Sequence, residues 1–121
     1  MAEEKKDFWT PVMPLVQALL DKRALEVTVH DVSQLSGFAD LFIVAISRSE
    51  LNARSLRECV CDMLDKMGLD YRMEGESSIK WTLVDAGDVI VNILSRSGQE
   101  FYRLDSLWGD APTKRFTDEE D

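Results

Sequence analysis

The residues best suited to chemistry or recognition gather between positions 81 and 112. Large aromatic and apolar side chains recur there beside carboxylates: Trp81, Asp85, Asp88, Phe101, Tyr102, Leu104, Leu107 and Trp108. No nucleophile paired with a base, no metal-spaced ligand set and no glycine-rich phosphate loop accompanies them. Aromatic groups bury large areas at a low cost in entropy, so this segment is typical of docking onto another macromolecule. The alternative is that the same aromatics complete the protein's own core.

The charge of the chain narrows the class of partner. Its formal net charge is −9 at pH 7. A negative field repels phosphate backbones, which argues against nucleic acid as the main ligand and suits a basic protein partner. Solubility alone would also explain such a surface.

Membrane and targeting signals are absent from the sequence. The longest apolar run, residues 41–46, is far too short to cross a bilayer. The first seven residues carry acids and have no apolar region like that of a signal peptide. We therefore expect a cytoplasmic protein with no membrane partner.

Metal and redox sites have few candidate residues. Cys59 and Cys61 are the two cysteines, and His30 is the one histidine. On a helix, side chains two positions apart point about 200° away from each other, so these thiols cannot share an ion or form an unstrained disulfide. We expect reduced thiols, with Cys59 or its neighbour Val60 buried, a solvated His30, and no metal or other cofactor.

The elements that must position the aromatic segment begin with a helix and two strands. Thr10-Pro11 predicts a helix start, and the apolar face that follows ends near residues 21–23. Apolar and polar residues alternate over 25–30, which predicts a half-exposed strand. Residues 41–46 do not alternate, which predicts a central strand covered on both faces.

A long helix and three more strands follow. Ser47-x-x-Glu50 reads as a capping box, with Ser49 as a competing cap, and Gly68 ends the helix. Strands are predicted over residues 71–74, 81–84 and 89–94, the last two joined by a tight hairpin. Spaced apolar residues over 101–108 predict one short helix.

This order predicts one α/β (α+β) domain over residues 10–112. Its single mixed sheet would have five strands flanked by helices. Residues 1–9 would be a flexible N-terminus, and the charged residues 113–121 an acidic flexible tail.

In order and spacing, these motifs resemble the ribosomal silencing factor family, also called Iojap-like proteins. The match runs from about residue 25 to residue 112. Its pieces are Asp40 with its apolar strand, Ser49, Glu74-Gly75-Glu76, Trp81-x-x-x-Asp85-x-Gly87-Asp88-Val89-x-Val91 and Phe101-Tyr102-x-Leu104-x-x-Leu107-Trp108. Each piece is weak alone, and the linked set is specific.

The resemblance implies a non-enzymatic translation repressor. Such a protein binds the large ribosomal subunit through large-subunit protein fourteen and sterically blocks association with the small subunit. The resemblance also implies a nucleotidyltransferase-like topology without a catalytic site, and a homodimer when free. The partner-binding residues would be Trp81, Tyr102, Leu104, Asp105, Leu107 and Trp108.

The chain also departs from the family pattern. The glycine usual after the central strand is missing from Ile46-Ser47-Arg48-Ser49. Leu51 and Asn52 replace an arginine–histidine pair, and Asn92 replaces a histidine. None of these changes touches the matched aromatic residues.

Two other functions stay open. A nucleotidyltransferase-like enzyme would need convergent carboxylates for metal-assisted phosphoryl transfer, whereas Asp85 and Asp88 bracket a turn and are first of all hairpin residues. A self-associating adaptor would use the aromatic face for dimerisation.

The aromatic segment itself allows a mixture of roles. Leu104 and Leu107 are expected in the core, and Tyr102 is expected at the surface. Trp81 opens a strand with one core face, so it either completes the core or contacts a partner. The same two roles are open to Trp108.

Overall fold

The computed structural model describes residues 7–37, 39–75, 78 and 80–117. Its elements, in chain order, are a short 3-10 helix η2 (Thr10–Val12), α1 (Met13–Asp21), β1 (Glu26–Asp31), β2 (Leu41–Ile46), α2 (Glu50–Lys66), β3 (Arg72–Glu74), β4 (Trp81–Asp85), β5 (Val89–Leu94), α3 (Arg96–Tyr102), α4 (Leu104–Leu107) and β6 (Thr113–Thr117). This order confirms the predicted α+β class.

The sheet is mixed and has six strands in the order β3-β4-β5-β2-β1-β6. β2 and β5 run parallel, and the other neighbouring pairs are antiparallel. The prediction of five strands was wrong, because residues 113–117, expected in a loose tail, pair along β1 with Val27 opposite Phe116. Lys114 and Phe116 are half-buried there, while their neighbours in β6 stay exposed.

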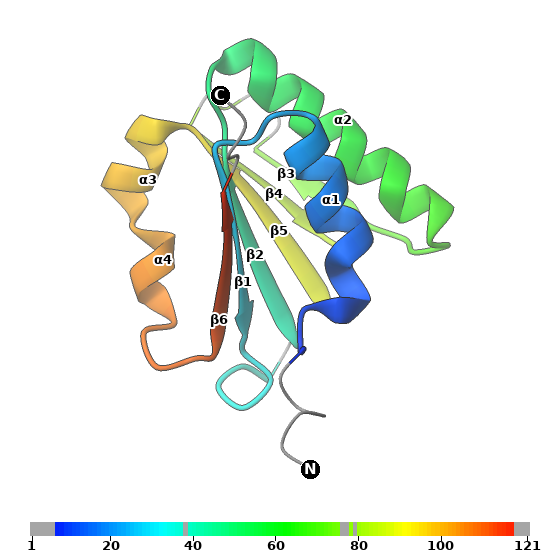
Figure 1. Cartoon of the computed structure of the whole chain (residues 1–121), viewed down its shortest axis with the longest axis vertical. Helices are drawn as coiled ribbons and strands as arrows, with labels where there is room; N and C mark the ends of the chain where they lie inside the picture. The colour runs from blue at the N-terminus through cyan, green and yellow to red at the C-terminus, as the bar shows by residue number, and fades with distance from the viewer. Residues whose placement is uncertain (1–6, 38, 76–77, 79, 118–121) are drawn as a thin grey trace.

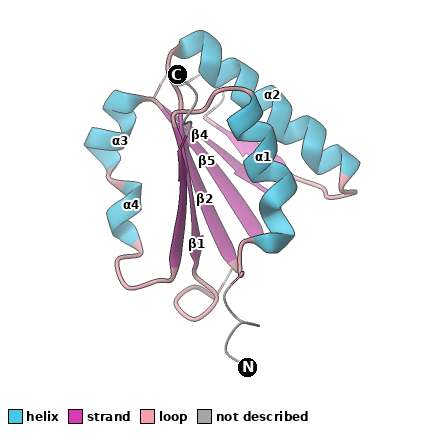
Figure 2. Ribbon diagram, viewed as in Figure 1, coloured by secondary structure: helices cyan, strands magenta, loops and turns pink. Residues whose placement is uncertain are grey.

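Helices cover both faces of this sheet. α1 and α2 lie on one face, and α3 and α4 lie on the other (Figures 1 and 2). The fold therefore has three layers, with a hydrophobic cluster on each side of the sheet.

No helix in the described part of the chain is long and apolar enough to cross a membrane.

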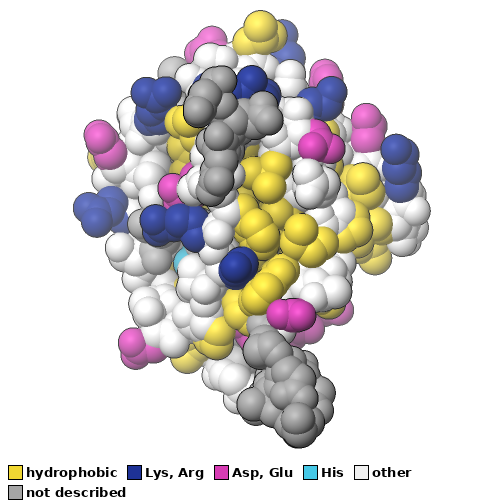
Figure 3. All heavy atoms as spheres, in the orientation of Figure 1, with side chains coloured by type: hydrophobic (Ala, Val, Ile, Leu, Met, Phe, Trp, Pro, Cys, Tyr) yellow, Lys and Arg dark blue, Asp and Glu magenta, His cyan; other side chains and the backbone are white. Residues whose placement is uncertain are grey.

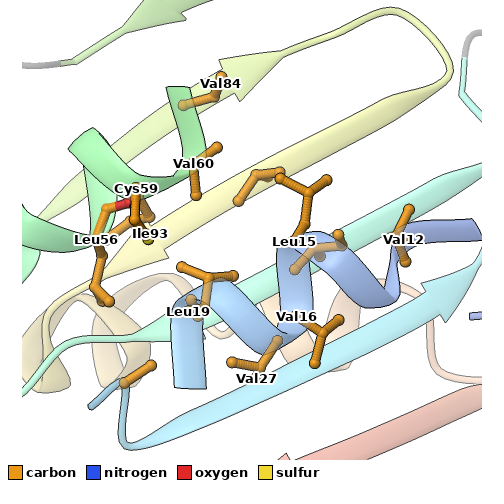
Figure 4. Close-up of a cluster of buried hydrophobic side chains, with 14 of the residues drawn as sticks. Val12, Leu15, Val16, Leu19, Val27, Leu56, Cys59, Val60, Val84 and Ile93 are labelled. Carbon is orange, nitrogen blue, oxygen red and sulfur yellow. The ribbon is translucent and has the colours of Figure 1, made fainter. Parts of the chain in front are cut away.

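The larger cluster lies under α1 and α2. Leu15 and Leu19 of α1 meet Leu56 and Val60 of α2 over the sheet (Figure 4). The residues before η2 also reach β6, because the Lys114 ammonium lies 5.1 Å from the centre of the Trp9 ring. Figure 3 shows hydrophobic side chains gathered between α1 and the sheet.

β1 is buried on both faces, contrary to the half-exposed strand that its alternation predicts. Thr28 and His30 are each only 2% exposed. The imidazole Nδ1 of His30 lies 2.9 Å from the hydroxyl of Thr113, which opens β6. The expectation of a solvated His30 was wrong because the sixth strand and the α3–α4 layer cover this part of β1.

The N-cap of α2 is Ser49, not Ser47. The Ser49 hydroxyl accepts a hydrogen bond from the backbone N–H of Asn52 at 3.0 Å. Ser47 is buried, and its hydroxyl donates to the carbonyl of Leu94. The competing cap is therefore the one that forms.

Both thiols are free, as expected. Cys59 and Val60 both lie on the buried side of α2. Burial raises the pKa of the Cys59 thiol to about 11, because the thiolate would lose its hydration. Cys61 is only half-buried.

The predicted helix over residues 101–108 is in fact two helices. α3 starts earlier, because the Ser95 hydroxyl accepts a hydrogen bond from the backbone N–H of Gly98. Arg103 then has φ 53°, a left-handed conformation that ends α3 and precedes α4. The break changes which side chains of this segment face the sheet.

Candidate protein-docking surface

Trp81 and Tyr102 lie against each other although they come from different elements. Trp81 begins β4 and is half-buried, and Tyr102 ends α3 and is 39% exposed. Their ring centroids are 4.8 Å apart and the ring planes are tilted by 52°. The structure thus brings together the two residues most strongly expected to dock.

Asn92 fixes the orientation of the Trp81 ring. The indole N–H donates to the side-chain oxygen of Asn92 at 2.8 Å, and the Asn92 amide donates to the carbonyl of Ile43 at 3.2 Å. Asn92 is fully buried on β5, so these bonds form where water cannot replace them. A lone amide inside an apolar strand is the signal that could have identified Asn92 as a positioning residue.

Close packing holds α3 against the residue before Trp81. Gly98 is buried in α3, and a Cβ atom at its position would collide with the backbone carbonyl of Lys80. The same carbonyl accepts a hydrogen bond from the backbone N–H of Ser95 at 3.1 Å. The start of α3 is therefore fixed to the start of β4.

Phe101 extends the aromatic pair outward. Its side chain is 70% exposed, and its ring meets the Tyr102 ring edge-on at 4.9 Å. The Lys80 ammonium lies 5.3 Å from the centre of the Phe101 ring. Phe101 was not among the predicted partner-binding residues, because its exposure depends on where α3 ends.

The two leucines of α4 have different environments. Leu104 is 7% exposed and packs in the second cluster, as expected, whereas Leu107 is 58% exposed, contrary to the core role expected for it. Asp105 lies in α4, and its side chain is outside the described residues. We define the aromatic docking surface as Trp81, Phe101, Tyr102 and Leu107.

Trp108 covers the sheet. It is half-buried, and its ring packs edge-on against Phe42 of β2 with 5.3 Å between centroids. Its indole nitrogen is buried and has no hydrogen-bond partner within the part of the chain described. The buried side of Trp108 thus belongs to the second cluster.

The acidic residues of the predicted constellation lie away from the aromatic ones. Trp81 and Asp85 stand at opposite ends of β4, about 13 Å apart along the strand. Asp85 accepts a hydrogen bond from the backbone N–H of Gly87, which has φ 89° in the hairpin turn. Among the described residues, no group of three or more His, Cys, Asp or Glu side chains could hold a metal ion.

The charges around the docking surface are mixed. Lys80, Arg96, Glu100 and Arg103 are exposed on α3 and next to its ends. The acidic excess of the chain is therefore carried elsewhere. The geometry offers rigid aromatic area with cations beside it, which is the chemistry of a protein contact.

Comparison with known proteins gives a consistent result. The family model described as "Ribosomal silencing factor during starvation" matches residues 6–121. The Ribosomal silencing factor RsfS of Bacillus subtilis is 34% identical over 93 residues, which cover 76% of this chain and 79% of that protein. The RsfS of Halalkalibacterium halodurans is 32% identical over 99 residues, which cover 81% of this chain and 85% of that protein.

A solved structure has the same fold. The crystal structure of a Chromobacterium violaceum protein superposes with a TM-score of 0.79 at 30% identity, over 85% of this chain and 87% of that one. The motifs, the fold and the family model agree over nearly the whole chain, and this chain belongs to the ribosomal silencing factor family.

Proposed function

We propose that this protein binds the large ribosomal subunit, chiefly through large-subunit protein fourteen, and thereby blocks association with the small subunit. Membership of the family gives it a ribosome-associated role in silencing translation. The observation that supports the finer proposal is the Trp81–Tyr102 ring pair. Asn92 accepts a hydrogen bond from the Trp81 indole, and the exposed Phe101 ring packs against Tyr102.

A steric block requires occupancy and no chemical step. Aromatic anchors in a rigid setting lower the dissociation rate, because little side-chain entropy is lost when they are covered. The net charge of −9 would attract a basic ribosomal protein over long range, although the acidic residues that carry it lie away from the docking surface. Repression then lasts as long as the protein stays bound to the large subunit.

Tyr102→Ala is the sharper test of this surface. Trp81→Ala would also leave the buried Asn92 side chain unpaired, so its effects on folding and binding would be mixed. If Tyr102 is a hot spot, its truncation costs about 2 kcal/mol, or about thirtyfold in affinity for the large subunit. The measurement is co-sedimentation with separated large and small subunits across a salt series.

Leu35→Ala is the matched control. Leu35 is 56% exposed in the loop between β1 and β2, so its truncation removes apolar surface that lies outside the docking surface. Its affinity should equal that of the wild type. Unchanged affinity in a folded Tyr102→Ala protein would remove that residue from the interface, and no binding to either subunit at low salt would overturn the proposal.

We also propose that the free protein is a cytoplasmic homodimer. The aromatic docking surface would serve both the dimer and the ribosome, so the partner would compete with the second copy. Sedimentation velocity should show a dimer that becomes a one-to-one complex when purified protein fourteen is added. A dimer that persists in the complex would show that dimerisation and ribosome binding use different surfaces.

A further inference from the structure

A hollow of about 550 Å³ opens at the end of the sheet opposite the aromatic docking surface. Val89, which begins β5, lines it, whereas Leu94, which ends β5, pairs with Trp81. Its floor is apolar, with Leu41 and Val89 from the sheet and Leu69 from the segment after α2. Hollows of this size and character hold ligands that bring apolar groups.

Three carboxylates line the same hollow. Asp31 ends β1, Asp40 precedes β2 and Asp88 precedes β5, so they stand on neighbouring strands. The backbone N–H of Asp40 donates to the carbonyl of Asp88 at 2.8 Å, which holds these two residues together. Among the lining residues that the structure describes, none is a lysine, an arginine or a histidine.

The side chains of Asp40 and Asp88 have unused acceptors. Both residues are exposed, and neither carboxylate forms a hydrogen bond or an ion pair in the described part of the chain. Asp31 differs, since it accepts hydrogen bonds from the backbone N–H and the hydroxyl of Ser33. The short helix η2 and the C-cap residue of α2, Met67, also line this hollow, and the three carboxylates are the formal charges among its described lining residues.

We infer that this hollow binds a basic segment of a partner protein, in which an arginine or lysine stands beside a bulky apolar side chain. The apolar side chain would cover Leu41, Val89 and Leu69, while the cation would bind Asp40 and Asp88 at the rim. The charge complementarity points to a cationic partner, and the apolar floor points to more than a bare ion. The inference concerns a second surface, because the hollow and the aromatic docking surface lie at opposite ends of β5.

Fluorescence anisotropy with a short labelled peptide tests this inference. The probe alternates arginine with leucine and is blocked at both ends. The double variant Asp40→Asn, Asp88→Asn keeps the side-chain shapes and removes two charges, so we expect affinity to fall about tenfold. Thermal unfolding of the variant checks that the fold is kept.

A matched double variant controls for overall charge. Asp62→Asn with Asp65→Asn removes two exposed charges from α2, neither of which is among the residues that line the hollow. It should leave the affinity for the peptide within about twofold of the wild type. Equal weakening by both double variants would mean that the peptide only senses net charge, and it would overturn the inference.

Three further arms identify the occupant. A peptide with glycine in place of leucine should bind at least several-fold more weakly, and equal binding would show that the apolar floor is not used. N-acetylarginine amide should compete poorly, and competition as strong as that of the peptide would make this a small-molecule site instead. Peptide binding seen only after residues 1–6 are deleted would assign the hollow to the chain's own N-terminal segment. Each of these contrary results overturns the inference and leaves the proposal for the docking surface intact.

Discussion

The two faces of the sheet are covered in different ways. On one face, α2 has 17 residues and, with α1, buries a continuous apolar cluster. On the other face, α3 has 7 residues and α4 has 4, and they leave Phe101 and Leu107 exposed. A long amphipathic helix can bury a whole stripe, whereas two short helices cannot. One face therefore stabilises the fold, and the other keeps aromatic area available for a partner.

The largest expected effect tests this division directly. Leu19 is fully buried between α1 and the sheet. Leu19→Ala should lower the free energy of unfolding by about 3 kcal/mol, from the lost burial and the cavity left behind. Urea unfolding followed by circular dichroism measures the change.

Leu107→Ala is the counterpart on the other face. The same truncation at an exposed leucine should change the free energy of unfolding by less than about 0.5 kcal/mol. Comparable losses in the two variants would show that both faces carry the stability, and the division would fail.

Gly98→Ala should disturb the α3 face more than any surface change there. The new methyl group meets the backbone carbonyl of Lys80, which cannot move without shifting β4. We expect a loss of about 2 kcal/mol in the free energy of unfolding, together with weaker binding to the large subunit. Gly109→Ala is the control, since the nearest atom to its new methyl group is 3.8 Å away. A Gly98→Ala protein with wild-type stability and binding would show that α3 is held loosely.

The Trp81–Asn92 bond should contribute a smaller, measurable share. Asn92→Ala leaves the Trp81 indole N–H without its acceptor and should cost about 1.5 kcal/mol in the free energy of unfolding. A double-mutant cycle with Trp81→Phe isolates the pair, and we expect the two losses to be less than additive. Strict additivity would mean that Asn92 stabilises the fold through its bond to the Ile43 carbonyl and its place in β5, and not through its bond to Trp81.

The smallest effect concerns the buried thiol of Cys59 in α2. Because the pKa of Cys59 is raised to about 11 in the folded protein, folding keeps its proton bound. This contribution is complete below the unfolded pKa near 9 and falls as pH rises toward 11, by about 1 kcal/mol at about pH 10. The difference in unfolding free energy between wild type and Cys59→Ala should shrink accordingly between neutral and alkaline pH. A constant difference would show that the thiol is not desolvated.

Much of the fold could be predicted because its signals are local. The unbroken apolar run of β2 and the capped, amphipathic α2 are both where the sequence places them. β6 was missed because a five-residue edge strand rich in charge carries only a weak alternation, visible in Lys114 and Phe116. The left-handed Arg103 gave no signal, since glycine and asparagine are the usual residues there.

The candidate site was less predictable, because its geometry depends on contacts across the fold. The residue types at Trp81 and Tyr102 suggested docking, and their stacking depends on how α3 packs against β4. The exposure of Phe101 and Leu107 follows from the position of the break between α3 and α4. A sequence pattern with one continuous helix assigns those side chains to the wrong faces.

The pairing of β6 with β1 has a consequence for the order of folding. Val27 lies beside Phe116, so these strands come from nearly opposite ends of the chain. During synthesis β1 emerges early and β6 late, which leaves β1 an unpaired edge until nearly the whole chain is available. Such an edge can pair with other chains. Strand β6 therefore protects the nascent protein from aggregation at the moment it completes the sheet.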